Sequence, residues 1–408
     1  MHSSRARALL RRLAAIGAAF VVASCGGGGG GDAPALRSDT EPGVASVAAA
    51  PIAGANVLQI RVEKSGQANL INTPFVTVRV CLPGSATCID VDRVVVDTGS
   101  SGLRINGSAL GGLALPAVTD NLQNVAQCHA FASGRTWGAV RRADVRMGGE
   151  VAAGVSIQVI DDAATPKPLG QCAPDIGSSL GGNGILGVGF TTEDCPECTT
   201  NASNGTYFRC AGATCNSIAL AAASQVSNPS ASFAANGNGV MIALPAVPSG
   251  GAASVTGWLV LGIGTQSNNQ LGSAGIYRPV LRPTLGYVFT TTYKGVAYDA
   301  SFIDSGSNGY FFNDAFTECG DFYCPDGSPL SLTAVNTAAA PPLTSASIDF
   351  ILDSVTAIRS DAAAAHIAGS IGFANTFDWG LPFFFGRTVF TARAGAATPA
   401  GAGPYWAY

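Results

Sequence analysis

Two short acidic motifs constrain this chain more than any other feature of its sequence. They are near copies separated by about half of the chain, and each ends an apolar run: Val94–Val96 leads into Asp97-Thr98-Gly99-Ser100, and Phe302–Ile303 leads into Asp304-Ser305-Gly306-Ser307. Two acids that each follow an apolar run, one in each half of a chain, can lie face to face in the folded protein. Carboxylates about 3 Å apart cannot both ionise, so they share a proton. The pair therefore predicts a site that deprotonates water and protonates a leaving group.

The residues that follow each acid suit this role. Gly99 is small, so backbone can approach Asp97 and donate N–H bonds that favour its charged form. Ser100 can donate its hydroxyl to the outer carboxylate oxygen, and Thr98 can bond to the opposite half and hold the two loops in register. In the second copy the same roles fall to Gly306, Ser307 and Ser305. Either motif alone is an ordinary turn sequence, but two copies after apolar runs favour a facing pair.

Short apolar or alternating segments bounded by turn residues predict an all-β protein with few short helices. The chain has 408 residues, of which 52 are Gly and only 12% are charged, which is typical of a Gly-rich β protein. Helices are expected only at Asn216–Ser224, with Asn216 as the N-cap, and at Asn313–Cys319. Strands are expected at Asn56–Val62, Phe75–Cys81, Ile89–Val96, Val155–Ile160, Val240–Leu244, Trp258–Ile263, Tyr287–Tyr293 and Ile348–Leu352.

The N-terminus has the features of an export signal. Basic residues precede the apolar stretch Leu13–Val22, which is too short to span a membrane comfortably and runs into small residues before Cys25. The pattern resembles a bacterial lipobox, which implies a signal peptide over residues 1–24 and a lipid on Cys25. The alternative is an ordinary signal peptide that contains a cysteine. Residues 25–54, rich in Gly, Ala, Pro and Ser, are expected to form the lipidated cysteine and a flexible linker.

Charge and motif content argue against several classes of partner. Removing residues 1–24 lowers Lys+Arg from 22 to 18 against 26 Asp+Glu, so the mature chain carries a net charge near −8. Without a basic stripe, we expect no nucleic-acid partner. The Gly-rich runs lack the setting of a phosphate loop. The two histidines after the signal, His129 and His366, are too few for a metal cluster, and we expect no cofactor and no metal.

The cysteines agree with export. Eleven cysteines minus Cys25 leave ten, which predicts five disulfides in an oxidising compartment. They lie in local sets: Cys81 with Cys88, Cys319 with Cys324, and a cluster of Cys195, Cys198, Cys210 and Cys215, while Cys128 and Cys172 remain. Connectivity within the cluster stays open. A zinc site there is the alternative, because Cys195-x-x-Cys198 has ligand spacing, but exported cysteines are usually oxidised.

The segment Val94–Leu103 resembles the first active-site segment of pepsin-like aspartic proteases. Other segments follow in the matching order. Asn183–Phe190 is similar to the family's apolar-apolar-Gly strand that crosses behind the first acid loop, Gly257–Gly264 resembles the strand that opens the second lobe, and Gly380–Phe390 resembles the closing segment. The similarity spans about residues 55–395. The chain also resembles a group of proteobacterial lipoproteins that carry the same motifs, from which no activity can be inferred.

The resemblance implies a bilobal fold with an active-site cleft between two similar β lobes. The first lobe would cover residues 55–235, with the first motif and a flap, and the second would cover residues 236–408. Asp97 and Asp304 would be the catalytic pair of a membrane-tethered aspartic endopeptidase, acting on a peptide or protein substrate as a monomer. Gly26 after Cys25 is not acidic, which favours the outer membrane of the cell envelope. The alternative is a catalytically weak or silent pepsin-like lipoprotein that binds peptides or proteins.

Several positions depart from the family's pattern or leave alternatives open. Phe131 replaces the flap tyrosine, and Trp137, six residues on, either donates an N–H in its place or simply packs. Arg104 stands where the family has a tryptophan. Asp378 stands where an apolar residue is expected, and a buried unpaired carboxyl is costly, so either it has a partner or the alignment is wrong there. Phe383–Phe385 is either an exposed recognition patch or, as we expect, a buried segment.

Overall fold

The protein is described from a computed structural model that covers residues 44–66, 70–161, 165, 167, 172–177, 180–212, 214–283, 285–360 and 362–408. Within these ranges the chain forms strands and short 3-10 helices, and no helix reaches seven residues. The prediction of an all-β protein with few short helices is confirmed. No helix in this part of the chain has the length and apolar character needed to cross a membrane. The predicted signal peptide and Cys25 lie outside the described residues and stay predictions.

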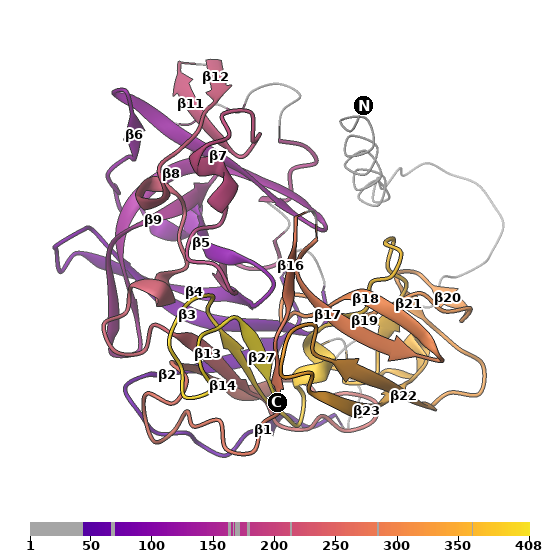
Figure 1. Ribbon diagram of the computed structural model, residues 1–408. Coiled ribbons are helices and arrows are strands. Elements are labelled where there is room, and N and C mark those ends of the chain that lie inside the picture. The colour runs from indigo at the N-terminus through magenta and orange to yellow at the C-terminus, as the bar shows by residue number, and fades with distance from the viewer. Residues whose placement is uncertain are drawn as a thin grey trace.

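Most strands join one large sheet that draws on both halves of the sequence. Figure 1 shows β13, β14 and β27, from the second half, next to β3 and β4 from the first. Its strands are β1 (Val47–Ala48), β2 (Val57–Glu63), β3 (Thr73–Cys81), β4 (Cys88–Asp97), β5 (Ser101–Asn106), β6 (Thr119–Asp120), β7 (Gln123–Phe131), β8 (Gly134–Met147), β9 (Glu150–Ile160), β10 (Gly184–Val188), β11 (Tyr207–Ala211), β12 (Thr214–Ser217), β13 (Gly239–Ala243), β14 (Val255–Leu261), β15 (Ile276–Tyr277), β26 (Thr388–Ala392) and β27 (Tyr405–Ala407).

A second sheet is built from the second half of the chain alone and lies beside the first (Figure 1). Its strands are β16 (Val280–Arg282), β17 (Gly286–Tyr293), β18 (Val296–Ile303), β19 (Tyr310–Phe311), β22 (Leu330–Thr337), β23 (Ser345–Leu352), β24 (Ala368–Gly369) and β25 (Asp378–Trp379). A small hairpin is formed by β20 (Glu318–Cys319) and β21 (Phe322–Tyr323). The 3-10 helices are η1 (Gly107–Leu110), η3 (Pro196–Thr199), η4 (Ala222–Ser224), η5 (Pro229–Ser232), η6 (Val355–Ala357) and η7 (Leu381–Phe384).

The strand leading to the first acid is covered on both faces, which explains its continuous run of valines. Val94 and Val96 point into the main hydrophobic core, whereas Val95 joins a separate apolar cluster with Phe75 and Ile185. Successive side chains of a strand point to opposite faces, so both faces of β4 bury valine here. The expected strand Ile89–Val96 is therefore confirmed, and its end fixes where Asp97 emerges.

Both helix predictions are wrong. Residues Thr214–Ser217 form β12, which pairs with β11, and only the 3-10 turn η4 follows. Ile218 and Leu220 are both buried in one cluster with Tyr207, so the apolar side chains alternate as in an extended chain. At the second site, Glu318–Cys319 pairs as β20 instead of ending a helix.

Two predicted boundaries differ from the observed strands. The sequence predicts a linker up to residue 54, but Val47–Ala48 pairs in parallel with β14, and the Trp258 indole donates to the Ala50 carbonyl at 2.9 Å. The division at residues 235 and 236 is not a division between the sheets, because β14 pairs with β2. The assignment of two lobes to these ranges stays a prediction.

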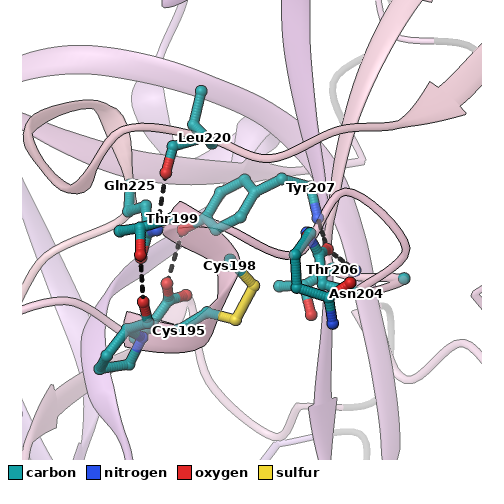
Figure 2. The surroundings of a disulfide bond; sticks show 12 residues. Cys195, Cys198, Thr199, Asn204, Thr206, Tyr207, Leu220 and Gln225 are labelled. Atoms are coloured by element: carbon teal, nitrogen blue, oxygen red, sulfur yellow. Dashed lines mark hydrogen bonds between the residues drawn. A yellow bond between two sulfur atoms is a disulfide. The ribbon is translucent and has the colours of Figure 1, made fainter.

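The prediction of five disulfides is confirmed. They join Cys81–Cys88, Cys128–Cys172, Cys195–Cys198, Cys210–Cys215 and Cys319–Cys324. Figure 2 shows the Cys195–Cys198 disulfide with Tyr207 beside it, and all three residues belong to one buried cluster. Because its cysteines pair with their sequence neighbours, the four-cysteine cluster resolves into two separate local bridges.

Candidate active site

The first acid loop is closed by hydrogen bonds to its own carboxylate. The Gly99 N–H donates to Asp97 Oδ1 at 2.8 Å, and the Ser100 N–H donates to the same oxygen at 3.2 Å. The Ser100 hydroxyl donates to Asp97 Oδ2 at 2.5 Å. Each such bond favours the ionised carboxylate. Asp97 is buried, whereas Gly99 is exposed, so the loop presents its glycine on the open side.

The second acid loop repeats this arrangement. The Gly306 N–H donates to Asp304 Oδ1 at 2.7 Å, and the Ser307 hydroxyl donates to Asp304 Oδ2 at 2.8 Å. Gly306 is exposed, as Gly99 is, and Asp304 is half-buried. The residues predicted to support the acids by their spacing therefore contact them in both loops.

The two acids lie against each other. The Gly99 N–H that binds Asp97 also donates to Asp304 Oδ1 at 3.0 Å, so one donor serves both carboxylates. A Cβ atom on Gly99 would lie 2.7 Å from Asp304 Cγ, and one on Gly306 would lie 2.8 Å from Asp97 Oδ1. Any side chain at either glycine would therefore displace the opposite acid.

Hydrogen bonds between Thr98 and Ser305 hold the loops in register. The Ser305 N–H donates to Thr98 Oγ1 at 3.0 Å, and the Thr98 N–H donates to Ser305 Oγ at 3.1 Å. The Ser305 hydroxyl in turn donates to the Val96 carbonyl at 2.8 Å. Both side chains are buried, where an unmade hydrogen bond is costly. The residue after each acid thus fixes the position of the opposite loop.

A crossing strand lies behind each acid loop. In the first half β10 runs parallel to β4 and antiparallel to β5, with Gly187 level with Asp97. In the second half β25 runs parallel to β18 and antiparallel to β19. A Cβ on Gly187 would lie 2.8 Å from Ser100 Oγ, and one on Gly380 would lie 2.7 Å from the Ser307 carbonyl. Both crossings therefore require glycine where the strand meets the loop.

The environment of the pair favours a shared proton. Burial raises the pKa of Asp304 to about 8, with the adjacent Asp97 charge and its hydrogen bond as further causes, against the lowering effect of Gly306 and Ser307. Two interacting carboxyls titrate as one system. The pair can therefore hold one proton over a wide range of pH, with Asp304 as the favoured site.

The hairpin of β7 and β8 carries Phe131 at its tip, followed by the exposed turn residues Ala132 and Ser133. Phe131 packs against the apolar cluster that contains Val95 and Ile185, next to the first acid loop. Trp137 lies elsewhere: it is buried, packs edge-on against Phe208, and its indole donates to the Thr165 carbonyl at 3.4 Å. Of the two alternatives for Trp137, the structure favours packing.

Below the hairpin tip lies a buried polar network that the sequence analysis missed. Arg104 sits 5.6 Å from the Phe131 ring centre and pairs with Asp194 at 2.5 Å, and both charged side chains are fully buried. Asp194 also accepts hydrogen bonds from Gln127 and, at 2.5 Å, from the Tyr207 hydroxyl. The network could have been inferred from Arg104 alone, because a charged residue in an apolar segment requires a buried partner.

His129 completes this network from strand β7. Its Nδ1 lies 3.4 Å from Asp194 Oδ2. Burial lowers the pKa of His129, and the Arg104 charge lowers it further, against the opposing effect of Asp194. Burial disfavours an ionised Asp194, but His129 and Arg104 outweigh it, and the pKa of Asp194 is lowered. The network thus pairs a charged arginine with a charged carboxylate near Asp97.

Asp378 lies on β25, the crossing strand of the second half. It pairs in parallel register with Phe302, two residues before Asp304, and only 4% of its surface is exposed. Among the residues that the structure describes, its Oδ1 has no hydrogen-bond partner. Phe383, Phe384 and Phe385 are also buried, as expected. Asp378 is therefore a buried carboxyl on the crossing strand of the second half, whereas the alignment of this segment with the pepsin-like family stays a prediction.

Cys195, Glu197 and Cys198 form a grouping of potential metal ligands within the described residues. The two sulfurs are joined in a disulfide, so neither is a thiolate ligand. The alternative that the four-cysteine cluster binds zinc therefore fails, because disulfide sulfurs are not thiolate ligands.

Comparison with known families places most of the described residues in one family. A comparison with curated proteins finds no match. Residues 53–408 match the family described as "Protein of unknown function (DUF3443)". This match begins just before β2 and includes both acid loops, the hairpin and both crossing strands. The chain belongs to the DUF3443 family.

Proposed function

We propose that this protein is a pepsin-like aspartic endopeptidase of the bacterial cell envelope, tethered through a lipid on Cys25. The observation that carries the proposal is the single Gly99 N–H that binds the carboxylates of both Asp97 and Asp304. The repeated crossing strands support a bilobal arrangement in which each half supplies one acid. Peptide would lie over the acids, beneath the hairpin that carries Phe131.

The chemistry follows from the shared proton. On addition of water, Asp304 donates its proton to the carbonyl oxygen of a peptide, while Asp97 accepts a proton from the attacking water. The roles exchange between addition of water and departure of the amine. The exposed faces of Gly99 and Gly306 leave room for a backbone close to both acids. Activity should fall as the pH rises through the upper pKa of the pair.

The test uses the full-length chain, expressed with its own N-terminal signal and purified in detergent. It is incubated with a diverse peptide library from pH 3 to 9, and cleavage products are identified by mass spectrometry. We expect cleavage in wild type, and a loss of at least about 100-fold in kcat/KM for Asp97→Asn and for Asp304→Asn, because each removes an acid–base group. Asp349→Asn, at an exposed aspartate on β23, is the matched control. Cleavage that survives in both dyad variants would refute the proposal.

One observation favours a second function. The hairpin tip carries Phe131, which has no hydroxyl to orient a substrate, and its ring lies against Arg104 and an apolar cluster. A protein that binds peptides in the same place without cutting them would retain these contacts. Peptides that bind to wild type at every pH without cleavage, with affinity unchanged in Asp97→Asn, would favour this function.

A further inference from the structure

A buried side chain binds the backbone carbonyl that lies four positions after each acid. In the first half this carbonyl belongs to Ser101, and it accepts a hydrogen bond from Arg104 Nη1 at 3.0 Å. In the second half it belongs to Asn308, and it accepts a hydrogen bond from Asn72 Nδ2 at 2.8 Å. Both donor side chains are buried. The repeat therefore holds the same carbonyl in both halves, but with different residues.

The two donors come from different parts of the chain. Arg104 lies on β5, three positions after the carbonyl that it binds, so the first acid loop is held by its own strand. Asn72 lies directly before β3, 236 positions before Asn308. The second acid loop is thus held by a residue of the first half.

The Asn72 side chain uses its whole amide in this contact. Besides the bond to Asn308, Nδ2 donates to the Ala364 carbonyl at 2.7 Å, and Oδ1 accepts from the Ala364 N–H at 2.8 Å. An amide nitrogen has two protons to donate, so both are used. Only 1% of the Asn72 surface is exposed, so the loss of any of these bonds would be costly.

The backbone around Asn72 is also fixed against the second half. Its own N–H donates to the Ala362 carbonyl at 2.9 Å. Its φ of 57° lies in the left-handed region, which asparagine and glycine adopt more readily than other residues. The preceding Ile71 is buried in one cluster with Ile358 and Ile367. This short segment of the first half is therefore docked on the second half by both polar and apolar contacts.

We propose that Asn72 is a positioning residue that anchors the second acid loop from the opposite half and so keeps Asp304 within reach of the Gly99 N–H. Ser305 is bonded to the first half at the start of this loop, and Asn308 is bonded to it at the end. A loop released at Asn308 could move away from the first half together with its acid. The consequence for catalysis rests on the proposed function, whereas the anchoring does not.

Hydrogen exchange, followed by mass spectrometry on the full-length protein without substrate, tests the anchoring. Asn72→Gly keeps the left-handed backbone, which glycine adopts without strain, and removes only the side chain. We expect residues 305–312 to exchange at least about fivefold faster than in wild type, because the loop loses a buried hydrogen bond. Residues 98–103, which Arg104 holds, should keep the wild-type rate. Asn121→Gly, at an exposed asparagine with a φ of 49°, is the matched control and should change neither loop.

Asn72→Asp is a second variant, with nearly the same shape as wild type. It keeps the oxygen that accepts from the Ala364 N–H but places a second oxygen against the carbonyls of Ala364 and Asn308. We expect the same local acceleration of exchange at residues 305–312. Unchanged exchange there in both variants would mean that the loop does not depend on Asn72. Equal acceleration in both acid loops would mean that Asn72 supports only the fold as a whole, and either result would overturn the proposal.

Peptide cleavage tests the consequence for Asp304. A misplaced acid slows the chemical step more than it weakens peptide binding, so Asn72→Gly should lower kcat at least about tenfold and leave KM within about twofold of wild type. A raised KM with an unchanged kcat would contradict the positioning role. If wild type cleaves no peptide, the proposed function fails, and the exchange measurement alone decides whether Asn72 anchors the loop.

Discussion

At the residue scale, the candidate site depends on four small side chains and two acids. The motif residues could be predicted from sequence because their contacts are local: Gly99 and Ser100 bind an acid only two or three positions away. The burial of Asp378 could not be predicted, because it arises only once β25 lies beside β18. The sequence showed that a carboxyl stands where an apolar residue is expected, but it did not show how the fold accommodates that carboxyl.

The raised pKa of Asp304 predicts a pH-dependent stability. An unfolded aspartate titrates near 3.9, whereas burial and Asp97 raise the pKa of Asp304 to about 8. Below about pH 4 the carboxyl is protonated in both the folded and the unfolded state, and the contribution of Asp304 to stability is fully present. Between about pH 4 and 8 unfolding releases the proton, so the contribution of Asp304 to stability is lost as the pH rises.

Urea unfolding at intervals from pH 4 to 8 measures this effect. Wild type should lose stability across the range more steeply than Asp304→Asn, because asparagine has no proton to release. Asp349→Asn, whose aspartate is exposed, should follow the wild-type slope. Parallel slopes for wild type and Asp304→Asn would show that Asp304 titrates in its ordinary range.

At the element scale, the hairpin of β7 and β8 is anchored by the polar network beneath it. Arg104 comes from β5, Gln127 and His129 from β7, and Tyr207 from β11, all meeting at Asp194. The sequence could not predict this convergence, because Arg104 and Asp194 are 90 positions apart. The failed helix at Asn216–Ser224 has the same cause: pairing with β11 overrides local helix propensity.

Removing the charge of Asp194 should strongly destabilise the protein. In Asp194→Asn the buried Arg104 loses its counter-ion, which we expect to lower the free energy of unfolding by about 3–5 kcal/mol. Chemical denaturation measures the loss. Asp90→Asn, which breaks the exposed pair with Arg79, is the matched control and should cost less than about 1 kcal/mol.

A double variant separates charge from packing in this network. Replacing Arg104 by methionine in the Asp194→Asn background removes the uncompensated charge while keeping an apolar side chain below Phe131. We expect the double variant to be more stable than Asp194→Asn alone. A further loss of stability in the double variant would mean that Arg104 contributes mainly through its contact with Phe131 and its bonds to the Ser101 and Gly102 carbonyls.

At the scale of the whole molecule, the internal repeat could be recognised because each half ends a strand with the same acidic turn. How the halves join could not be predicted. Strand β14 follows the predicted boundary at residue 236, yet it pairs with β2 from the first half within the large sheet. Pairing partners far apart in sequence are set by the packing of the complete chain, and local alternation of residues does not encode them.

The disulfides should stabilise the molecule unequally, in proportion to the chain that each one closes. Cys128–Cys172 spans 44 positions and ties the hairpin strand β7 to the segment after β9, whereas Cys319–Cys324 spans five within a small hairpin. The loss of unfolded-chain entropy grows with loop length, so replacing the first pair by alanine should cost about 4 kcal/mol and the second about 2 kcal/mol. Guanidinium unfolding of the two double-alanine variants measures both values. Because Cys128 and Cys172 are also buried, their removal adds a packing loss in the same direction. An equal or larger loss for the Cys319–Cys324 pair would show that native-state contacts, and not chain closure, determine what these bridges contribute.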